Sequence, residues 1–276
     1  MNWRAAVRGF TLLELLLVIL ITGILAAVVA PVIRQPVQAY FDQAGRAELV
    51  YSAEMALRNI ARDARRSLPY SVRINAAQTA VEFVRITDAA RYNTTGNNAE
   101  RLRFNNPDGS FSLVGRFSNI TTSPYVLSGD ERLVVFNLGA AGQDIYQGDP
   151  VATPDAATMT ITISDNGNEH GITLVPDHQF DQASPSNRVY LANGAISYAC
   201  FNGGLFRQSG YGYVSTQPAP SVVAAGILMT DNVTDCQFDY DPGNAGRPGL
   251  LVMKLTLTRN GESIALLREV HIPNAT

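Results

Sequence analysis

The apolar residues of this chain are concentrated near its N-terminus. Residues 10–33 read FTLLELLLVILITGILAAVVAPVI, and no charged residue occurs in the 19 positions from Leu15 to Ile33. At a rise of about 1.5 Å per residue, this uncharged run makes a helix of about 28 Å, close to the hydrocarbon thickness of a bilayer. The pattern predicts a membrane-spanning helix over residues 10–33. Pro31 and Pro36 predict a bend or a local break near its end.

Helical periodicity continues beyond the apolar run. Residues 34–68 carry apolar side chains at approximately helical spacing: Val37, Tyr40, Phe41, Ala44, Leu49, Ala53, Ala56, Leu57, Ile60 and Ala64. Arg62, Arg65 and Arg66 are expected in the last turns, where they suit the negative end of the helix dipole, and Pro69 is expected to end the helix. The pattern predicts an amphipathic continuation of the first helix.

Residues 69–276 have a different pattern, with short β-prone runs between clusters of Gly, Pro, Asn and Asp. The predicted strands are Tyr70–Asn75, Ala80–Ile86, Arg101–Phe104, Arg132–Asn137, Met159–Ser164, Ile172–Val175, Arg188–Ala192, Ile196–Phe201, Leu205–Gln208, Leu250–Arg259 and Glu262–Ile272. The last two flank Asn260-Gly261, a strong hairpin signal, and the polar stretch Asn93–Asn98 is predicted as a loop. The fold class predicted is α+β, a long N-terminal helix followed by a mostly antiparallel β domain.

Composition and motifs argue against two classes of function. The formal net charge is −3, and Lys254 is the only lysine among 21 basic residues, so no basic excess suggests a nucleic-acid partner. Because Leu255 follows Lys254, no phosphate-binding loop of the G-x-x-x-x-G-K-[ST] type exists. The three histidines have no obvious nucleophile beside them, and no hydrolase or dinucleotide-binding motif occurs. We therefore expect a protein that is not an enzyme.

The N-terminal flank and one acidic residue distinguish the apolar helix from common alternatives. Arg4 and Arg8 precede it, which by the positive-inside rule keeps the N-terminus in the cytoplasm. A secretory signal peptide has a shorter apolar core followed by an A-x-A-like site, which is missing here. A plain anchor leaves Glu14 unexplained, since an ionised group there costs about 3 kcal/mol on insertion.

Glu14 belongs to the segment Gly9-Phe10-Thr11-Leu12-Leu13-Glu14, with basic residues before it and an apolar helix after it. This segment resembles the prepilin signal of the type IV pilin and pseudopilin superfamily. The resemblance implies that residues 1–9 are a leader, that prepilin peptidase cuts between Gly9 and Phe10, and that the Phe10 amine is methylated. It also places Pro31 where such pilins commonly carry a helix-perturbing proline.

The same resemblance implies a role in assembly. Glu14 would neutralise the Phe10 amine of a neighbouring subunit, so that each buried charge lowers the cost of the other. The implied partners are other minor and major pilins, prepilin peptidase, the inner-membrane assembly platform and membrane lipid. The implied location is the bacterial inner membrane, as a single-pass protein with its β-rich domain (residues 69–276) in the periplasm, and then the pilus.

Four later segments resemble minor pilins of the MSHA (mannose-sensitive haemagglutinin) type IV pilus. They are Arg132–Gly148, Ser197–Gly212, Asp235–Leu257 and Gly261–Ile272. This resemblance implies a minor pilin that helps to initiate or tip the fibre. A type II secretion minor pseudopilin would share every N-terminal feature, and a pilus-tip adhesin is a further alternative.

Three other groups of residues carry weaker expectations. Export would place Cys200 and Cys236 in an oxidising compartment, which favours a disulfide over two free thiols. Oxygen-rich segments suggest a Ca²⁺ site less strongly than turns and strand edges; they contain Asp165, Asn166, Asn168, Glu169 and His170, and then Asp231, Asp235, Asp239 and Asp241. We expect no cofactor and no metal. Phe201, Phe206, Tyr211 and Tyr213 suggest core packing more strongly than a glycan-binding or partner face.

Overall fold

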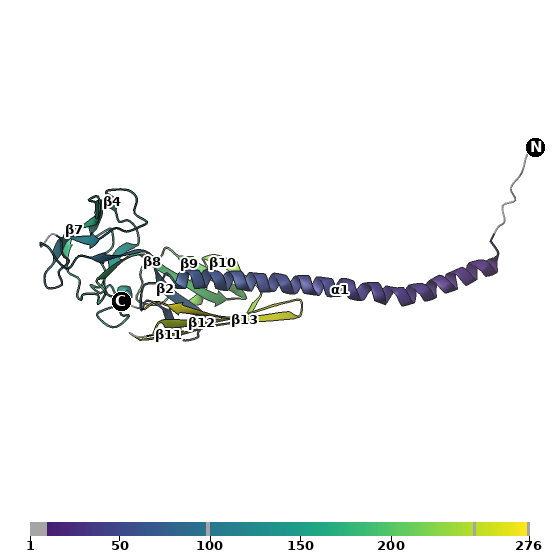
Figure 1. Ribbon diagram of the computed structural model, residues 1–276. Helices are drawn as coiled ribbons and strands as arrows, with labels where there is room; N and C mark the ends of the chain where they lie inside the picture. The colour runs from purple at the N-terminus through teal and green to yellow at the C-terminus, as the bar shows by residue number, and fades with distance from the viewer. Residues whose placement is uncertain (1–9, 98–99, 245–246, 275–276) are drawn as a thin grey trace, which may run out of the picture. The chain divides into compact units, whose positions relative to one another are not determined.

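The computed structural model describes residues 10–97, 100–244 and 247–274, and within them one long helix precedes thirteen strands (Figure 1). The chain divides into an N-terminal unit, Met1–Glu48, and a second unit, Leu49–Thr276, which we call the compact unit. The helix α1, Leu12–Ala64, supplies the regular structure described in the first unit and contributes the residues from Leu49 onward to the second. The leader predicted over residues 1–9, with Gly9 of the cleavage site, lies outside the described residues.

The long helix ends four residues before the predicted position. Its last residue is Ala64, because the following segment bonds to a strand instead of continuing the helix: the Ile86 N–H donates to the Arg66 carbonyl (2.9 Å) and the Leu68 N–H to the Val84 carbonyl (2.8 Å). Arg62 lies in the last turn as predicted, whereas Arg65 and Arg66 follow the helix. α1 runs without interruption through Pro31 and Pro36, so no local break occurs there, and the bend stays a prediction.

Ten strands of different lengths form one antiparallel sheet. Eight of them lie in the order β10-β9-β8-β2-β3-β7-β6-β4, while β1 pairs with β2 and β5 pairs with β8. The strands are β1 Arg73–Ile74, β2 Ala80–Tyr92, β3 Asp108–Val114, β4 Tyr125–Val126, β5 Glu131–Val134, β6 Thr160–Asp165, β7 His170–His178, β8 Arg188–Phe201, β9 Gly204–Ser209 and β10 Ile227–Thr230. The two longest, β2 and β8, pair along most of their length and form the centre of the sheet.

A second sheet has three strands in the order β11-β12-β13. These are β11 Val233–Asp241, β12 Gly249–Arg259 and β13 Glu262–Ile272. The turn between β12 and β13 consists of Asn260 and Gly261, both with positive φ (53° and 84°), as a tight hairpin turn of this kind requires. The hairpin predicted at these two residues is confirmed.

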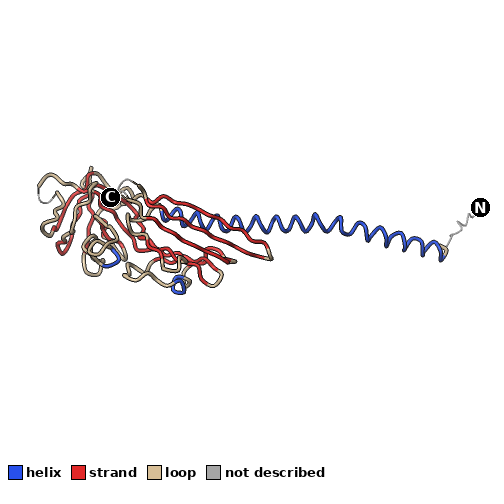
Figure 2. Tube along the Cα trace, turned by 90° about the horizontal axis from the view of Figure 1, so that it is seen from below, coloured by secondary structure: helices blue, strands red, loops and turns tan. Residues whose placement is uncertain are grey.

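The main core lies where α1 meets both sheets. Leu49, Leu57 and Ile60 of α1 are buried together with Phe83 and Tyr198 of the large sheet. Residues of the small sheet complete this core: Phe238, Leu251, Met253, Leu255, Leu257, Ile264, Val270 and Ile272. Figures 1 and 2 show strands lying along this part of the helix. Alanines such as Ala53 on the buried face let the helix approach the sheets closely.

Two further cores belong to the other end of the large sheet. One lies among β3, β6, β7 and the ends of β2 and β8, around Phe111, Leu113 and Phe180. The other packs the short helix η1, Ile145–Gln147, against β2 and β8. A second short helix, α2 (Pro220–Val223), buries Val223 against Ala80 and Ala199. The compact unit thus buries one long helix segment and several connecting loops.

The predicted α+β class is confirmed, with local corrections. Arg101–Phe104 is not a strand; Leu102 is buried, so its apolar signal reports burial in an irregular segment. Tyr70–Asn75 shortens to β1, and β3, β4, β10 and β11 were not predicted. The described part of Asn93–Asn98 is a loop, as predicted. The first strand begins at Arg73, beyond the predicted boundary at residue 69, and the compact unit begins at Leu49 because the helix is part of its core.

Candidate functional site

The described chain begins at the start of the apolar helix. Phe10 is 75% exposed, and the Oγ1 of Thr11 accepts a hydrogen bond from the Glu14 N–H (3.3 Å), which caps the first turn of α1. Glu14 lies in that first turn, where the helix dipole favours a negative charge. The helix dipole therefore favours an acidic residue at this end of the helix.

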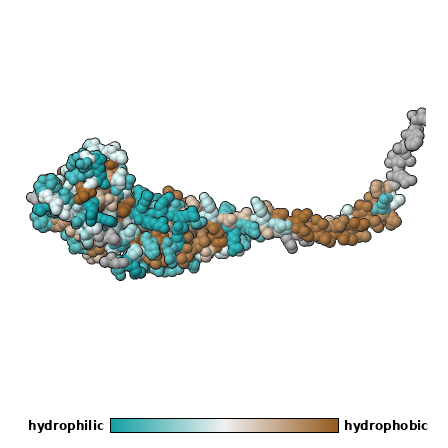
Figure 3. Space-filling model, viewed as in Figure 1, coloured by the Kyte–Doolittle hydropathy of each residue, from teal (hydrophilic) through white to brown (hydrophobic). Residues whose placement is uncertain are grey.

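The helix that follows has an apolar surface on every side. Each side chain described from Leu12 to Val29 is exposed, and the large hydrophobic ones are between 47% and 77% exposed. Figure 3 shows the visible face of this part of α1 as mostly hydrophobic surface. Thr22 donates to the Val18 carbonyl (2.7 Å), so its hydroxyl is satisfied within the helix. By length and composition the helix is apolar enough to cross a membrane.

Glu14 has no cationic partner among the described residues. The next charged residue along α1 is Arg34, 20 positions later, or about 30 Å along a helix. An exposed carboxylate is stable in water, but inside an apolar bundle or bilayer it needs a neutralising cation. The described part of this chain supplies no such cation close to Glu14.

The two cysteines form a disulfide that joins the sheets. Cys200 in β8 and Cys236 in β11 are bonded, with a Cα–Cα distance of 6.4 Å, so the predicted pairing is confirmed. Neighbouring main-chain contacts hold the same junction. The Cys200 N–H donates to the Thr79 carbonyl (2.9 Å), and the Phe238 N–H donates to the Gln78 carbonyl (2.8 Å).

The aromatic residues that suggested either a core or a ligand face are mostly part of cores. Phe206 packs against the Ala80–Ala199–Val223 core, and Tyr211 and Tyr213 pack against the core around η1. The Tyr213 hydroxyl donates to the Asp130 carbonyl (2.9 Å). Phe201 is half-buried at the end of β8. These contacts support packing as the role of three of the four aromatics.

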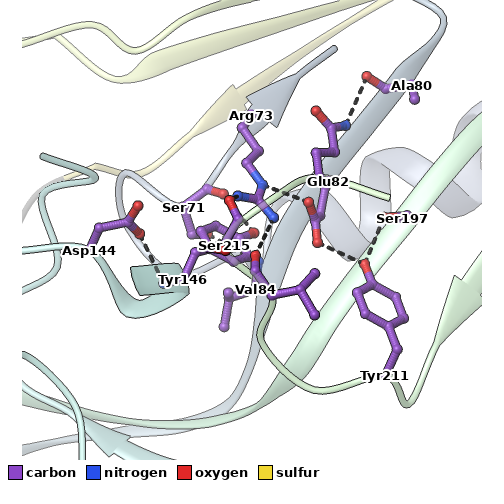
Figure 4. A network of polar contacts seen from close by, with 12 residues as sticks. Ser71, Arg73, Ala80, Glu82, Val84, Asp144, Tyr146, Ser197, Tyr211 and Ser215 are labelled. Carbon is purple, nitrogen blue, oxygen red and sulfur yellow. Dashed lines mark hydrogen bonds and ion pairs between the residues drawn. The ribbon is translucent and has the colours of Figure 1, made fainter. Parts of the chain in front are cut away.

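A polar network that the sequence analysis missed lies inside the compact unit (Figure 4). The Arg73 Nε donates to the buried Glu82 carboxylate (2.6 Å), and the Tyr211 hydroxyl donates to the same group (2.9 Å). Arg73 also donates to the carbonyls of Val214 (2.7 Å) and Ser215 (2.8 Å). One arginine therefore ties the segment after β9 to β1 and β2.

The aromatic ring of Tyr146 packs against the Arg73 guanidinium and extends the network to η1. The Arg73 guanidinium carbon lies 3.7 Å from the centre of the Tyr146 ring, a cation–π contact. The Tyr146 hydroxyl donates to the Ser71 carbonyl (3.0 Å), and the Asp144 carboxylate accepts from the Tyr146 N–H (3.0 Å). Tyr146 thereby positions η1 beside the segment that follows the long helix.

Burial perturbs the titration of these groups. Burial raises the pKa of the Glu82 carboxyl, while the hydrogen bond and charge of Arg73 oppose that rise. Burial also raises the pKa of Tyr146 and of Tyr211, with the nearby Glu82 charge adding to the effect. The network positions loops rather than presenting a reactive group. The sequence contains one signal for it, since Glu82 interrupts an otherwise apolar run, AVEFV.

The oxygen-rich segments form turns and a strand. Asp165 accepts from the Gly167 N–H (2.8 Å), and the Asn166 N–H donates to the Glu169 carbonyl (3.0 Å), which builds the turn between β6 and β7. In β11, Asp235 forms an ion pair with Lys254 (2.9 Å). No group of three His, Cys, Asp or Glu side chains suited to a metal occurs within the described residues.

Comparison with known proteins identifies the N-terminal segment. Residues 4–30 match the family described as the prokaryotic N-terminal methylation motif, the type IV pilin-like prepilin signal. No curated protein and no solved structure matches the chain. The motif supports membership of the pilin and pseudopilin superfamily and processing by prepilin peptidase. Together with the apolar helix, it supports membrane anchoring, contact with the pilus machinery and a structural, non-enzymatic role.

Proposed function

We propose that this chain is a minor pilin of an MSHA-type IV pilus, most like the minor pilin MshO, and that it acts in pilus assembly and initiation. The observation that carries the assembly role is Glu14. It is a single carboxylate at the head of an apolar helix, has no cationic partner among the described residues, and lies within the prepilin-like motif.

The proposed mechanism begins with processing between Gly9 and Phe10. Cleavage exposes a Phe10 amine, which is then methylated and remains a cation. During assembly this amine enters an apolar helical bundle, where Glu14 of an adjacent subunit neutralises it. The pairing sets the axial position of one helix relative to the next, and the apolar surface of residues 10–33 supplies the rest of the contact. In the membrane, the N-terminus would be cytoplasmic and the compact unit periplasmic.

The assignment to the MSHA pilus is supported by the resemblance of the four segments between Arg132 and Ile272. Within the compact unit, those segments contribute β5, η1, β8, β9, β11, β12 and β13. A type II secretion pseudopilin would share the N-terminal helix. Deleting the gene in its native host separates the two: loss of surface pili supports the proposal, and loss of protein secretion with normal piliation contradicts it.

The assembly role is tested by Glu14→Ala and Glu14→Leu. Both variants should insert in the membrane at normal levels, because removing a charge does not weaken an apolar span, and both should reduce the number of assembled pili. Glu54→Ala is the matched control, since Glu54 forms an i,i+4 ion pair with Arg58 on the helix surface, worth about 0.3–0.5 kcal/mol. Normal piliation in the Glu14 variants would refute the proposed charge pairing.

A further inference from the structure

Two adjoining hollows on the compact unit are lined by arginines. The first, of about 610 Å³, lies beside Arg66 and Arg85, and the second, of about 530 Å³, lies beside Arg91 and Arg188. Ala89 of β2 lines both, so the two hollows adjoin. We call this surface the arginine groove; the other residues that line it are Asp63, Ile86, Thr87, Asp88, Ala90, Ser118, Asn119 and Ser186.

The arginines at one end of the groove repel each other. Arg91 in β2 and Arg188 in β8 are direct cross-strand partners, and both are exposed. Like charges placed directly opposite each other in an antiparallel pair are destabilising. Arg91 donates to the Ser186 carbonyl (3.2 Å), but within the described chain neither arginine has an acidic partner. The repulsion between Arg91 and Arg188 therefore lowers the stability of the β2–β8 pair and leaves two exposed positive charges side by side.

The hollow at the other end is lined by two arginines and two aspartates. The Arg85 Nε is buried with no hydrogen-bond partner among the described residues, and Arg66 is exposed. Asp63 accepts hydrogen bonds from the Tyr198 hydroxyl (2.7 Å) and the Arg207 Nε (3.3 Å).

Asp88 is similarly satisfied by its own chain. It accepts from the main-chain N–H groups of Asn119 (2.7 Å) and Ala89 (2.8 Å) and from the Ser118 hydroxyl (3.2 Å). These hydrogen bonds orient the carboxylates without removing their charge, so the hollow beside Arg66 and Arg85 is formally neutral, and the excess positive charge of the groove lies at Arg91 and Arg188.

The spacing and the neutral groups identify the kind of ligand. Arg85 and Arg91 are six positions apart on β2, at most about 20 Å at the rise of a strand. The hollow beside Arg85 also has hydroxyl and amide side chains, Ser118 and Asn119, which are exposed. We propose that the arginine groove binds an acidic polysaccharide, whose carboxylates pair with Arg91 and Arg188 and whose sugar hydroxyls bond to the polar groups of the adjoining hollow.

The same features argue against a nucleic acid. Duplex DNA carries a charge about every 1.7 Å along its axis, much denser than two arginine pairs about 20 Å apart. Single-stranded binding sites stack bases on aromatic side chains, and the described residues that line the groove include none. The chain as a whole is also acidic, with a formal charge of −3.

The proposal is tested by calorimetric titration of the full-length chain in uncharged detergent with oligogalacturonate. We expect binding that weakens as salt is added, with no binding of a neutral dextran of equal length. Arg91→Gln combined with Arg188→Gln should weaken binding at least about tenfold, from the loss of charge-assisted hydrogen bonds. Arg247→Gln, which removes an exposed arginine paired with Asp241 elsewhere, should leave the affinity unchanged.

A charge reversal provides the readout that a purely structural role would not give. Arg188→Glu places opposite charges across the β2–β8 pair, so it should abolish oligogalacturonate binding while raising the thermal midpoint of the unliganded protein. Unchanged binding in the double variant would overturn the proposal. So would equal binding of dextran, tighter binding of duplex DNA or polyglutamate, or a lower thermal midpoint in Arg188→Glu.

Discussion

The disulfide between β8 and β11 should contribute a measurable and calculable part of the stability. Cys200 and Cys236 are 36 positions apart. In the chain-entropy description, cross-linking a loop of that length stabilises the folded state by about 4 kcal/mol at 25 °C, because the unfolded chain loses conformational freedom. The double variant Cys200→Ser with Cys236→Ser should lose about this much free energy of unfolding.

The folded state should survive this change. Main-chain hydrogen bonds at the same junction remain, including those from Cys200 to Thr79 and from Val233 to Gly203, both 2.9 Å. The core shared by α1 and both sheets also remains. The double variant should therefore keep the native far-ultraviolet circular dichroism spectrum at 25 °C.

Urea unfolding followed by circular dichroism measures the effect. Tryptophan fluorescence is unsuitable, because the single tryptophan is Trp3, outside the compact unit. With an m-value of about 3 kcal/mol/M, a loss of about 4 kcal/mol lowers the midpoint by about 1.3 M. Dithiothreitol should lower the wild-type midpoint similarly and leave the double variant unchanged. A loss below about 1 kcal/mol would refute the loop-entropy reasoning.

Two further predictions concern the core and the polar network. Leu57 is 3% exposed, so Leu57→Ala should lower the free energy of unfolding by about 2–5 kcal/mol in urea unfolding. Leu267 is 63% exposed, so Leu267→Ala should change that free energy by less than about 0.5 kcal/mol. Equal effects of the two substitutions would contradict the assigned core. Burial raises the pKa of Glu82 above its ordinary value of 4.5, so its contribution to stability is present below that pH and is lost as the pH rises through the folded-state pKa. The stability of wild type relative to Glu82→Gln should thus fall as the pH rises above about 4.5, and a difference that grows with pH would contradict the burial effect.

Local sequence signals predicted the elements that depend on local physics. The apolar run and its helical continuation, the Asn260-Gly261 hairpin and the strands β12 and β13 follow from periodicity and turn residues. Strand β8 is one continuous strand where two, Arg188–Ala192 and Ile196–Phe201, were predicted. Strand β11 was missed because it carries several aspartates on its exposed side, which resemble a loop. Strand β3 was missed because it begins with Asp108-Gly109, a turn-like pair.

Long-range contacts explain the remaining differences. The helix ends at Ala64 because Arg66 and Leu68 find main-chain partners in β2, which no local signal shows. The contact of Arg73 with Val214, and the register that sets Arg91 against Arg188, likewise join residues far apart in sequence. The proposed assembly residues, Phe10 and Glu14, need no long-range contact to be recognised, since both belong to one short sequence segment.

The central claim is that the chain is processed as a prepilin, and mass spectrometry of the mature N-terminus tests it most directly. The protein would be purified from the membranes of a host that contains prepilin peptidase and digested for sequencing of its first peptide. The account predicts a chain that begins at an N-methylated Phe10. An intact Met1, or cleavage at any other bond, would contradict it.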